Sequence, residues 1–158
     1  MEQSGPNAGT SSCPDTTAVL LIAHGSRRQS ANDDLHELAA RLTAQGTYPI
    51  IEACFLELSE PDIPTGGHKC VLRGASRVLL IPYFLSAGVH LRRDLTGARD
   101  ELCRLHPSVD FRLGAPLGPH PLLDELVAER IRELDPRDPH NALTFRAITS
   151  IDTNLAKQ

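Results

Sequence analysis

The sequence Ala18-Val-Leu-Leu-Ile-Ala-His24-Gly-Ser26 joins a continuous apolar run to a histidine. An uninterrupted apolar run is typical of a strand that is covered on both faces, as in a parallel α/β sheet. Two later runs have the same form: Ile50-Ile-Glu-Ala-Cys-Phe-Leu-Glu57 ends in a glutamate, and Val78-Leu-Leu-Ile-Pro-Tyr-Phe-Leu-Ser-Ala-Gly-Val-His90 ends in a second histidine. The two intervals between these polar residues are both 33 residues (57 − 24 and 90 − 57).

Helical patterns separate the apolar runs. Strands are predicted over residues 18–23, 50–56, 77–84 and 109–113, and helices over residues 30–45, 63–73, 91–105 and 122–134. The helix over 63–73 is the weakest of these predictions, because Gly66 and Gly67 fall inside it and glycine costs about 1 kcal/mol in a helix interior. The βαβαβαβα order predicts an α/β protein with three α/β/α layers and a four-stranded parallel sheet.

The chain of 158 residues is long enough for a single domain with a proper core. We expect that domain to occupy residues 18–134. Residues 1–17 are rich in Ser, Gly, Pro and Thr and are predicted to form a disordered leader, since they lack the basic and apolar regions of a secretory signal. Residues 135–158 follow a Pro-rich segment and are predicted to form a loose tail.

Charge and hydropathy exclude two classes of partner. The net charge of −4 disfavours nucleic acid, whose phosphates need a basic face. Membrane insertion is not expected either, because no apolar run approaches the roughly 20 residues of a membrane span. The four cysteines form no C-x-x-C pair, and Cys54 and Cys70 lie in apolar patterns typical of buried thiols. A reduced, cytoplasmic protein is expected.

His24, Glu57 and His90 follow or end three consecutive strand signals. The carboxyl ends of neighbouring parallel strands meet at one edge of the sheet, where ligands bind. Two imidazoles and a carboxylate at that edge predict a site for a divalent transition metal with a proton acceptor beside it. Apolar neighbours of Glu57 are expected to disfavour its charged form. Each residue also has a plainer interpretation: a loop hydrogen bond for His24, an outward-pointing Glu57, and a helix-start histidine at position 90.

Arginine pairs follow both histidines. Arg27-Arg28 come three residues after His24, and Arg92-Arg93 come directly after Leu91. Paired arginines are common at solvated helix starts, yet the positive end of a helix makes cations there mildly unfavourable. A polyanionic substrate would explain them, because the guanidinium fork binds carboxylates well.

Small residues and further histidines complete the candidates. Ser86 and Gly88 lie in a predicted strand-to-helix loop, where a ligand can approach the backbone closely. His120 opens the last helix and is a candidate substrate contact, with loop structure as the alternative. His68 and His106 are predicted to be solvated surface residues.

Four segments together resemble the sirohydrochlorin chelatase family of the CbiX/SirB type, the class II tetrapyrrole chelatases. They are HGSRRQSANDDL, CFLELSEPDIP, GASRVLLIPYFLSAGVHLRRDL and LGAPLGPHPLL, and the resemblance runs over residues 18–134. It implies a flavodoxin-like chelatase fold. It also implies ATP-independent insertion of Fe²⁺, Co²⁺ or Ni²⁺ into sirohydrochlorin, in siroheme or cobalamin biosynthesis. The metal would be a substrate, with no cofactor permanently bound.

The resemblance also assigns residue roles. The two histidines of the family fall on His24 and His90, and its acidic residue falls on Glu57, which would serve either as base or as metal ligand. Arg27, Arg28, Ser86, Gly88, Arg92, Arg93 and His120 are the expected substrate-binding residues. The module occurs once, which implies a homodimer. The segment Gly66-Gly67-His68-Lys69 departs from the smoother helix usual in the family, and the tail after Asp135 has no counterpart.

Two other functions remain open at this point. A non-catalytic carrier of metal or tetrapyrrole would use the same cleft for delivery. A flavodoxin-like nucleotide or flavin binder would need a Gly- or Thr-rich phosphate loop after the first strand. Here that loop reads His24-Gly25-Ser26-Arg27-Arg28, with a single glycine, so this is the weaker alternative.

Overall fold

The computed structural model describes residues 15–135, so most of the predicted leader and tail lies outside the described part of the chain. Strands and helices alternate along it: β1 (Thr17–Ala23), α1 (Gln29–Ala44), β2 (Ile50–Phe55), α2 (Ile63–Leu72), β3 (Arg77–Pro82), α3 (Val89–Leu105), β4 (Asp110–Leu113) and α4 (Pro121–Leu134). Each of the eight predicted elements is present. The described residues fall into two compact units: one ends at Leu117 and contains the sheet, and the other begins at Gly118 and contains α4. Within residues 15–135, no helix is both long and apolar enough to cross a membrane.

All four strands of the first unit are parallel, in the order β2-β1-β3-β4. The strand order reverses beside β1, which is hydrogen-bonded to β2 on one side and to β3 on the other. Its last residue, Ala23, is level with Phe55 of β2, and Ile22 is level with Pro82 of β3. The carboxyl ends of the three strands therefore lie at one edge, where open α/β sheets bind ligands.

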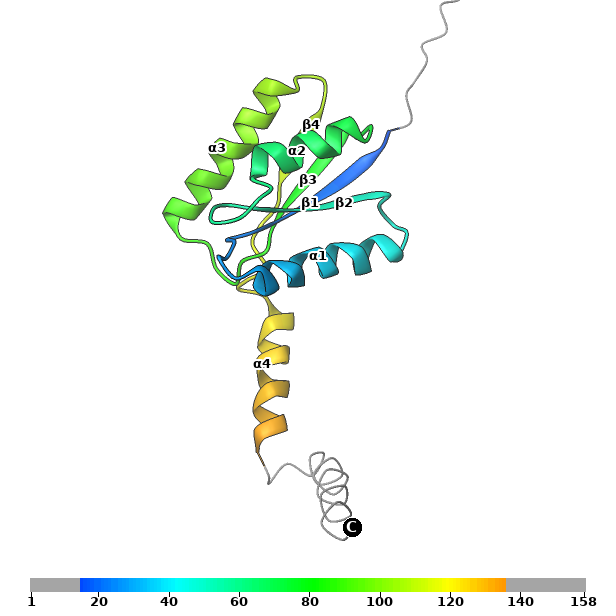
Figure 1. Cartoon of the computed structure of the whole chain (residues 1–158). Helices are drawn as coiled ribbons and strands as arrows, with labels where there is room; N and C mark the ends of the chain where they lie inside the picture. Colours follow the sequence, from blue (N-terminus) through cyan, green and yellow to red (C-terminus); the bar gives the residue numbers. More distant parts are fainter. Residues whose placement is uncertain (1–14, 136–158) are drawn as a thin grey trace, which may run out of the picture. The chain divides into compact units, whose positions relative to one another are not determined.

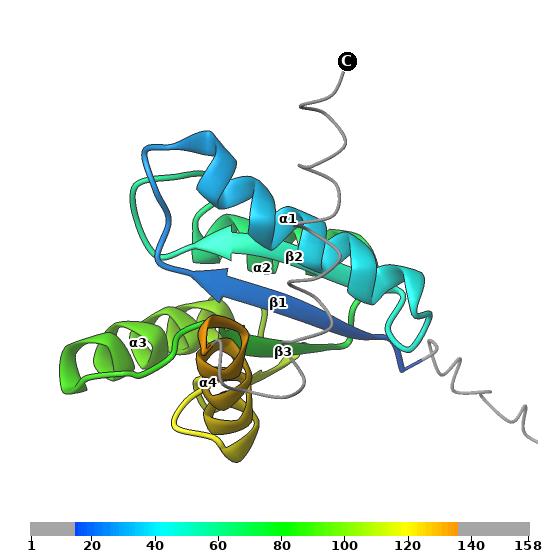
Figure 2. The same cartoon turned by 90° about the horizontal axis from the view of Figure 1, so that it is seen from below.

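Helices cover both faces of the sheet, with α1 on one side and α2 and α3 on the other (Figure 1). Figure 2 shows α1 running along β1 and β2. Successive residues of β1 feed the two cores: Leu20 and Ile22 pack toward α2 and α3, and Val19 and Leu21 pack toward α1. Burial of each such side chain stabilises the folded state by roughly 1.5–3 kcal/mol. A continuous apolar run is thus required in β1, as the sequence predicts.

The glycine pair inside α2 is explained by close packing. A Cβ on Gly66 would lie 2.8 Å from the Cβ of Cys54, and one on Gly67 would lie 2.5 Å from Cδ2 of Leu102. The helix starts at a proper cap, because the Asp62 side chain accepts a hydrogen bond of 2.8 Å from the backbone N–H of Thr65. Glycine's intrinsic cost is therefore offset by a close approach of α2 to β2 and α3.

Most element boundaries lie within one residue of the sequence prediction, and two differ from it by two residues. β3 ends at Pro82 instead of residue 84, and α3 begins at Val89 instead of residue 91. Gly88 is the N-cap of α3, and its extended backbone starts the helix directly after the loop. His90 consequently belongs to the first turn of α3, which changes its place in the candidate site.

Candidate functional site

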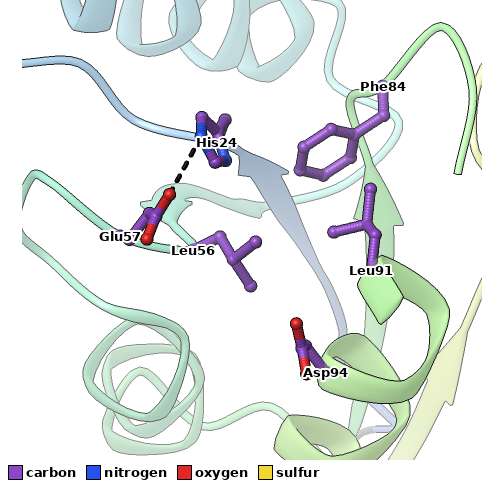
Figure 3. A pocket seen from close by; sticks show the side chains of 6 residues that line it. All are labelled: His24, Leu56, Glu57, Phe84, Leu91 and Asp94. Carbon is purple, nitrogen blue, oxygen red and sulfur yellow. Dashed lines mark ion pairs between the residues drawn. The ribbon is translucent and has the colours of Figure 1, made fainter. Parts of the chain in front are cut away.

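His24 and Glu57 form the polar centre of the site. The pairing of β1 and β2 continues past the strand ends, because the N–H of Leu56 donates to the carbonyl of Ala23 (2.9 Å) and the N–H of Glu57 donates to the carbonyl of His24 (3.0 Å). The two side chains meet on top of this ladder, with Nε2 of His24 3.0 Å from Oε1 of Glu57 (Figure 3). Parallel strand register therefore joins two residues that are 33 positions apart in the sequence (57 − 24).

Gly25 permits this close approach of the two loops. Its φ of +94° lies in the left-handed region, which disfavours side chains. A Cβ at this position would stand 1.9 Å from the carbonyl oxygen of Glu57. The glycine of the His-Gly-Ser segment is thus required by the contact between the two strand ends.

Asn32 bridges the same two loops through side-chain hydrogen bonds. Its side chain is 2% exposed, and it is the buried polar residue of the described core. Oδ1 accepts a hydrogen bond from the N–H of Ser26 (2.9 Å), and Nδ2 donates to the carbonyl of Ser26 (2.8 Å) and to Oγ of Ser59 (3.0 Å). Asn32 on α1 therefore ties the loop after His24 to the loop after Glu57. Asn32 is not among the candidates predicted from the sequence, because a single asparagine in a helical pattern does not indicate a buried side chain.

A pocket of about 540 Å³ opens beside the pair, within the usual range of small-molecule sites. Its apolar wall consists of Leu56, Phe84 and Leu91. Asp94 faces the same pocket from α3, across from the His24–Glu57 pair (Figure 3). Asp94 was not a candidate in the sequence; its place one helical turn after His90 was the available signal.

The expected three-residue metal site is not assembled in this structure. His90 is exposed in the first turn of α3 and does not line the pocket, whereas Leu91 and Asp94 of the same helix do. Among residues 15–135, no three His, Cys, Asp or Glu side chains are grouped closely enough to hold a metal ion. Because α3 begins at Val89, His90 belongs to the first turn of that helix, where its side chain is exposed.

The four arginines lie where the sequence places them, at the starts of two helices. Arg28 is the N-cap of α1, and Arg92 donates from Nε to the carbonyl of Ala87 (3.1 Å). In the described part of the chain, no carboxylate lies within ion-pair distance of Arg27, Arg28, Arg92 or Arg93. Their guanidinium groups are therefore available to an anionic ligand.

The remaining candidates are loop and cap residues. Ser86 and Gly88 are exposed between β3 and α3, and a Cβ at Gly88 would meet no atom within 4 Å. His120 belongs to the second unit, where its Nδ1 accepts a hydrogen bond from the N–H of Leu122 (3.2 Å) and caps α4. This hydrogen bond gives His120 the structural role in the loop that the sequence left open as the alternative to substrate contact.

The His24–Glu57 pair is open to water. The side chains of His24 and Glu57 are 59% and 55% exposed, so the apolar neighbours of Glu57 do not remove it from water. This corrects the expectation of an apolar environment, since Leu56 points into the pocket while Glu57 reaches toward solvent and His24. Histidine and carboxylate side chains are the groups that enzymes use most often for general acid–base catalysis, and here they stand 3.0 Å apart.

The fold and this pocket define an α/β protein whose strand ends present a histidine–carboxylate pair to an apolar-walled cleft. Residues 18–134 match the CbiX family, and the chain belongs to that family. The resemblance inferred from the sequence is thereby confirmed.

Named relatives agree with this assignment. The chain is 35% identical over 118 residues to the chloroplastic sirohydrochlorin ferrochelatase of Arabidopsis thaliana, spanning 75% of this chain and 52% of the relative. It is 32% identical over 133 residues to the sirohydrochlorin cobaltochelatase of Priestia megaterium, spanning 84% and 42%. The chain thus spans about half the length of these relatives.

A solved structure shares the fold. The sirohydrochlorin chelatase SirB from Bacillus subtilis subspecies spizizenii, in complex with cobalt, superposes with a TM-score of 0.70 at 28% identity. The match covers 75% of this chain and 51% of that one. The flavodoxin-like chelatase architecture expected from the sequence is confirmed for the described sheet and its helices.

Proposed function

We propose that this protein inserts a divalent metal ion, Fe²⁺ or Co²⁺, into sirohydrochlorin. The observation that carries the proposal is the His24–Glu57 pair at the mouth of an apolar-walled pocket, in a chain of the CbiX family. Relatives named as ferrochelatase and as cobaltochelatase support both metals. The product would enter siroheme biosynthesis with iron and cobalamin biosynthesis with cobalt.

The apolar wall suits the macrocycle. A tetrapyrrole presents a large, flat, mostly apolar face, and Leu56, Phe84 and Leu91 offer an apolar surface for it to cover. A pocket of about 540 Å³ holds part of such a ring, so its edge extends over the pocket rim. The peripheral carboxylates of sirohydrochlorin would then reach the arginines at the starts of α1 and α3, with Ser86 and Gly88 offering backbone contact in the loop before α3.

The polar residues of the pocket divide two tasks, proton acceptance and metal binding. Insertion of one M²⁺ replaces two pyrrole N–H protons, so two protons must leave the ring for each metal that enters. Glu57 accepts one proton and passes it to water through its exposed oxygen. Asp94, across the pocket, is positioned to accept the second. His24 uses its neutral imidazole to hold the incoming metal, because imidazole suits Fe²⁺ and Co²⁺ without the permanence of a thiolate.

His90 remains part of the proposal as a residue that joins on metal arrival. It lies four residues before Asp94 on α3 and is exposed, so a rotamer change is free to bring its ring toward the rim. Its role is tested separately from that of His24: His90→Ala must reduce metallation while the fold persists. A His90→Ala protein with full activity removes it from the mechanism.

A homodimer is the second part of the proposal. The carboxyl edge of the sheet carries exposed apolar residues around the pocket, including Leu85 (70% exposed) and Val89 (80% exposed). Exposed apolar residues beside a polar site favour a covering partner. Light scattering coupled to size exclusion tests this: a monomer at all concentrations contradicts it.

A cytoplasmic location completes the proposal. The three cysteines of the described residues, Cys54, Cys70 and Cys103, are free thiols. Free thiols are typical of a reducing compartment. Cell fractionation with an antibody to the chain checks the location.

The deciding experiment is anaerobic absorbance spectroscopy of sirohydrochlorin with Fe²⁺, Co²⁺ or Ni²⁺, with and without protein. Multiple-turnover acceleration by the native chain, lost in His24→Ala and Glu57→Gln, is the expected result. Glu37→Gln is the matched control, because Glu37 is an exposed α1 residue paired with Arg41. Tight tetrapyrrole binding without acceleration would overturn the chelatase and leave a carrier.

A further inference from the structure

A second pair of imidazoles lies on the outer surface of α2 and α3. His68 of α2 and His106, the C-cap residue of α3, are 38 positions apart (106 − 68), yet Nδ1 of His68 is 3.4 Å from Nε2 of His106. The rings stack with centroids 5.2 Å apart and planes 23° from parallel. The two histidines therefore form a pair instead of two separate solvated residues.

The glycine of α2 explains why the pair forms. Gly67 packs so closely on Leu102 that a Cβ would come within 2.5 Å of that side chain. His68 follows Gly67 directly, and His106 follows Leu102 by one helical turn and donates its backbone N–H to the Leu102 carbonyl (2.9 Å). The same contact that brings the two helices together thus brings the two rings together.

The spacing of the nitrogens fits a metal ion. A tetrahedral Zn²⁺ with Zn–N bonds of about 2.0–2.1 Å holds two imidazole nitrogens about 3.3–3.4 Å apart. The observed separation of 3.4 Å is that distance. Two neutral imidazoles select borderline transition ions such as Zn²⁺, Co²⁺ and Ni²⁺ over Mg²⁺ or Ca²⁺, which need oxygen ligands.

Space for the remaining ligands is also present. A cavity of about 400 Å³ adjoins the pair and is lined by Pro64, Thr65, Leu105 and the two histidines. Within residues 15–135, no carboxylate lies within ion-pair distance of either imidazole. Water would therefore complete the coordination, and the bound ion would remain exchangeable.

We propose that His68 and His106 form a second binding site for a divalent transition metal ion, on the α2–α3 surface and separate from the His24–Glu57 pocket. In the free protein, one ring donates its N–H to the lone pair of the other. Binding requires lone pairs on both Nδ1 of His68 and Nε2 of His106, so the donor ring changes tautomer and no net proton leaves two neutral rings. The site holds the ion reversibly and carries out no metallation.

The test is calorimetric titration with ZnCl₂ in the absence of tetrapyrrole, using the full chain. Metal binding in the His24–Glu57 pocket is first removed by the double substitution His24→Ala and Glu57→Gln. His68→Gln or His106→Gln is then introduced into this double variant. Each added substitution is expected to remove one equivalent of bound Zn²⁺. His36→Gln is the matched control: it removes an exposed α1 histidine without a histidine partner and must leave the stoichiometry unchanged.

An unchanged isotherm in His68→Gln overturns the proposal. A spectroscopic readout of the unsubstituted chain makes the conclusion independent of how the variants fold. Zn²⁺ must shift the ¹⁵N resonances of His68 Nδ1 and His106 Nε2 together; a shift in neither also overturns it. Insertion of Fe²⁺ or Co²⁺ into sirohydrochlorin is expected to be unchanged in His68→Gln, so failure of the metallation proposal and failure of this one are distinguishable.

Discussion

Gly25→Ala is expected to separate the two halves of the proposed chelatase centre. The new Cβ would lie 1.9 Å from the carbonyl oxygen of Glu57, and contacts of that kind do not fall below 3.0 Å, so the backbones of residues 25 and 57 must separate by about 1.1 Å (3.0 − 1.9). This displacement lengthens the Glu57 N–H···O=C His24 hydrogen bond from 3.0 Å to about 4 Å, beyond bonding distance. The side-chain contact of 3.0 Å between His24 and Glu57 is lost with it.

The free-energy cost follows from the same geometry. An alanine at φ +94° costs roughly 1–2 kcal/mol, and the lost hydrogen bond adds roughly 1 kcal/mol, which gives a loss of roughly 2–3 kcal/mol in unfolding free energy. Misplacement of a reacting group by about 1 Å reduces turnover about 100-fold. Gly74→Ala is the matched control, since Gly74 has φ +92° but a Cβ there would meet no atom within 4 Å.

Urea denaturation and initial rates of sirohydrochlorin metallation measure the two effects. The control is expected to lose roughly 1–2 kcal/mol from backbone strain and to keep its turnover. Gly25→Ala is expected to lose more stability than the control and nearly all activity. If Gly25→Ala retains the turnover of Gly74→Ala, the close approach of the two loops is irrelevant to function and this reasoning is wrong.

Three further outcomes are expected. Asn32→Ala leaves the N–H and carbonyl groups of Ser26, in a half-buried loop, without their amide partner and is expected to cost roughly 1–3 kcal/mol in urea denaturation; a loss below about 1 kcal/mol would show that water replaces the amide. Asp94→Asn is expected to slow metallation about 100-fold at unchanged stability, whereas Asp100→Asn on the same helix keeps the native rate; equal rates for the two would exclude Asp94 as a proton acceptor. Burial, with a smaller effect of a nearby carboxylate, raises the pKa of Cys70 from 9.0 to about 12, and burial also raises the pKa of Cys54. Because the folded state keeps both thiols neutral, their contribution to stability is complete below about pH 9 and is lost as the pH rises toward 12; Cys70→Ala is expected to reduce this alkaline loss, and an unreduced loss would contradict it.

Local patterns determined most of the secondary structure. Predominantly apolar runs predicted β1, β2 and β3, because strands covered on both faces need apolar residues at most positions; Glu52 of β2 is the exception and pairs with Arg73. The same alternation of strand and helix signals predicted the parallel sheet. The helix boundaries were less determined: α3 begins at Val89 because Gly88 caps it, and the Ser-Ala-Gly segment before it is compatible with either start.

The proximity of His24 and Glu57 was predictable from the sequence. Both follow strands, and parallel strands gather their carboxyl ends at one edge, so the two side chains were expected to meet, as they do. Asp94 and Asn32 were not identified, because their roles depend on which side of α3 and of α1 turns toward the loops. His90 is the opposite case: its sequence position suggested the pocket, whereas in this structure its side chain is exposed and does not line the pocket.

By itself, the sequence determined the strand order along the chain, the apolar core and the chemistry available at the strand ends, because these depend on residue type and local spacing. Only the tertiary structure decided which of those residues meet. Three contacts join positions at least 27 residues apart: Gly25 with Glu57, Asn32 with Ser59, and His68 with His106. Asn32 also bonds to Ser26, six residues before it. Such contacts are set by strand register and by how closely helices pack, and neither quantity is encoded in the spacing of any single segment.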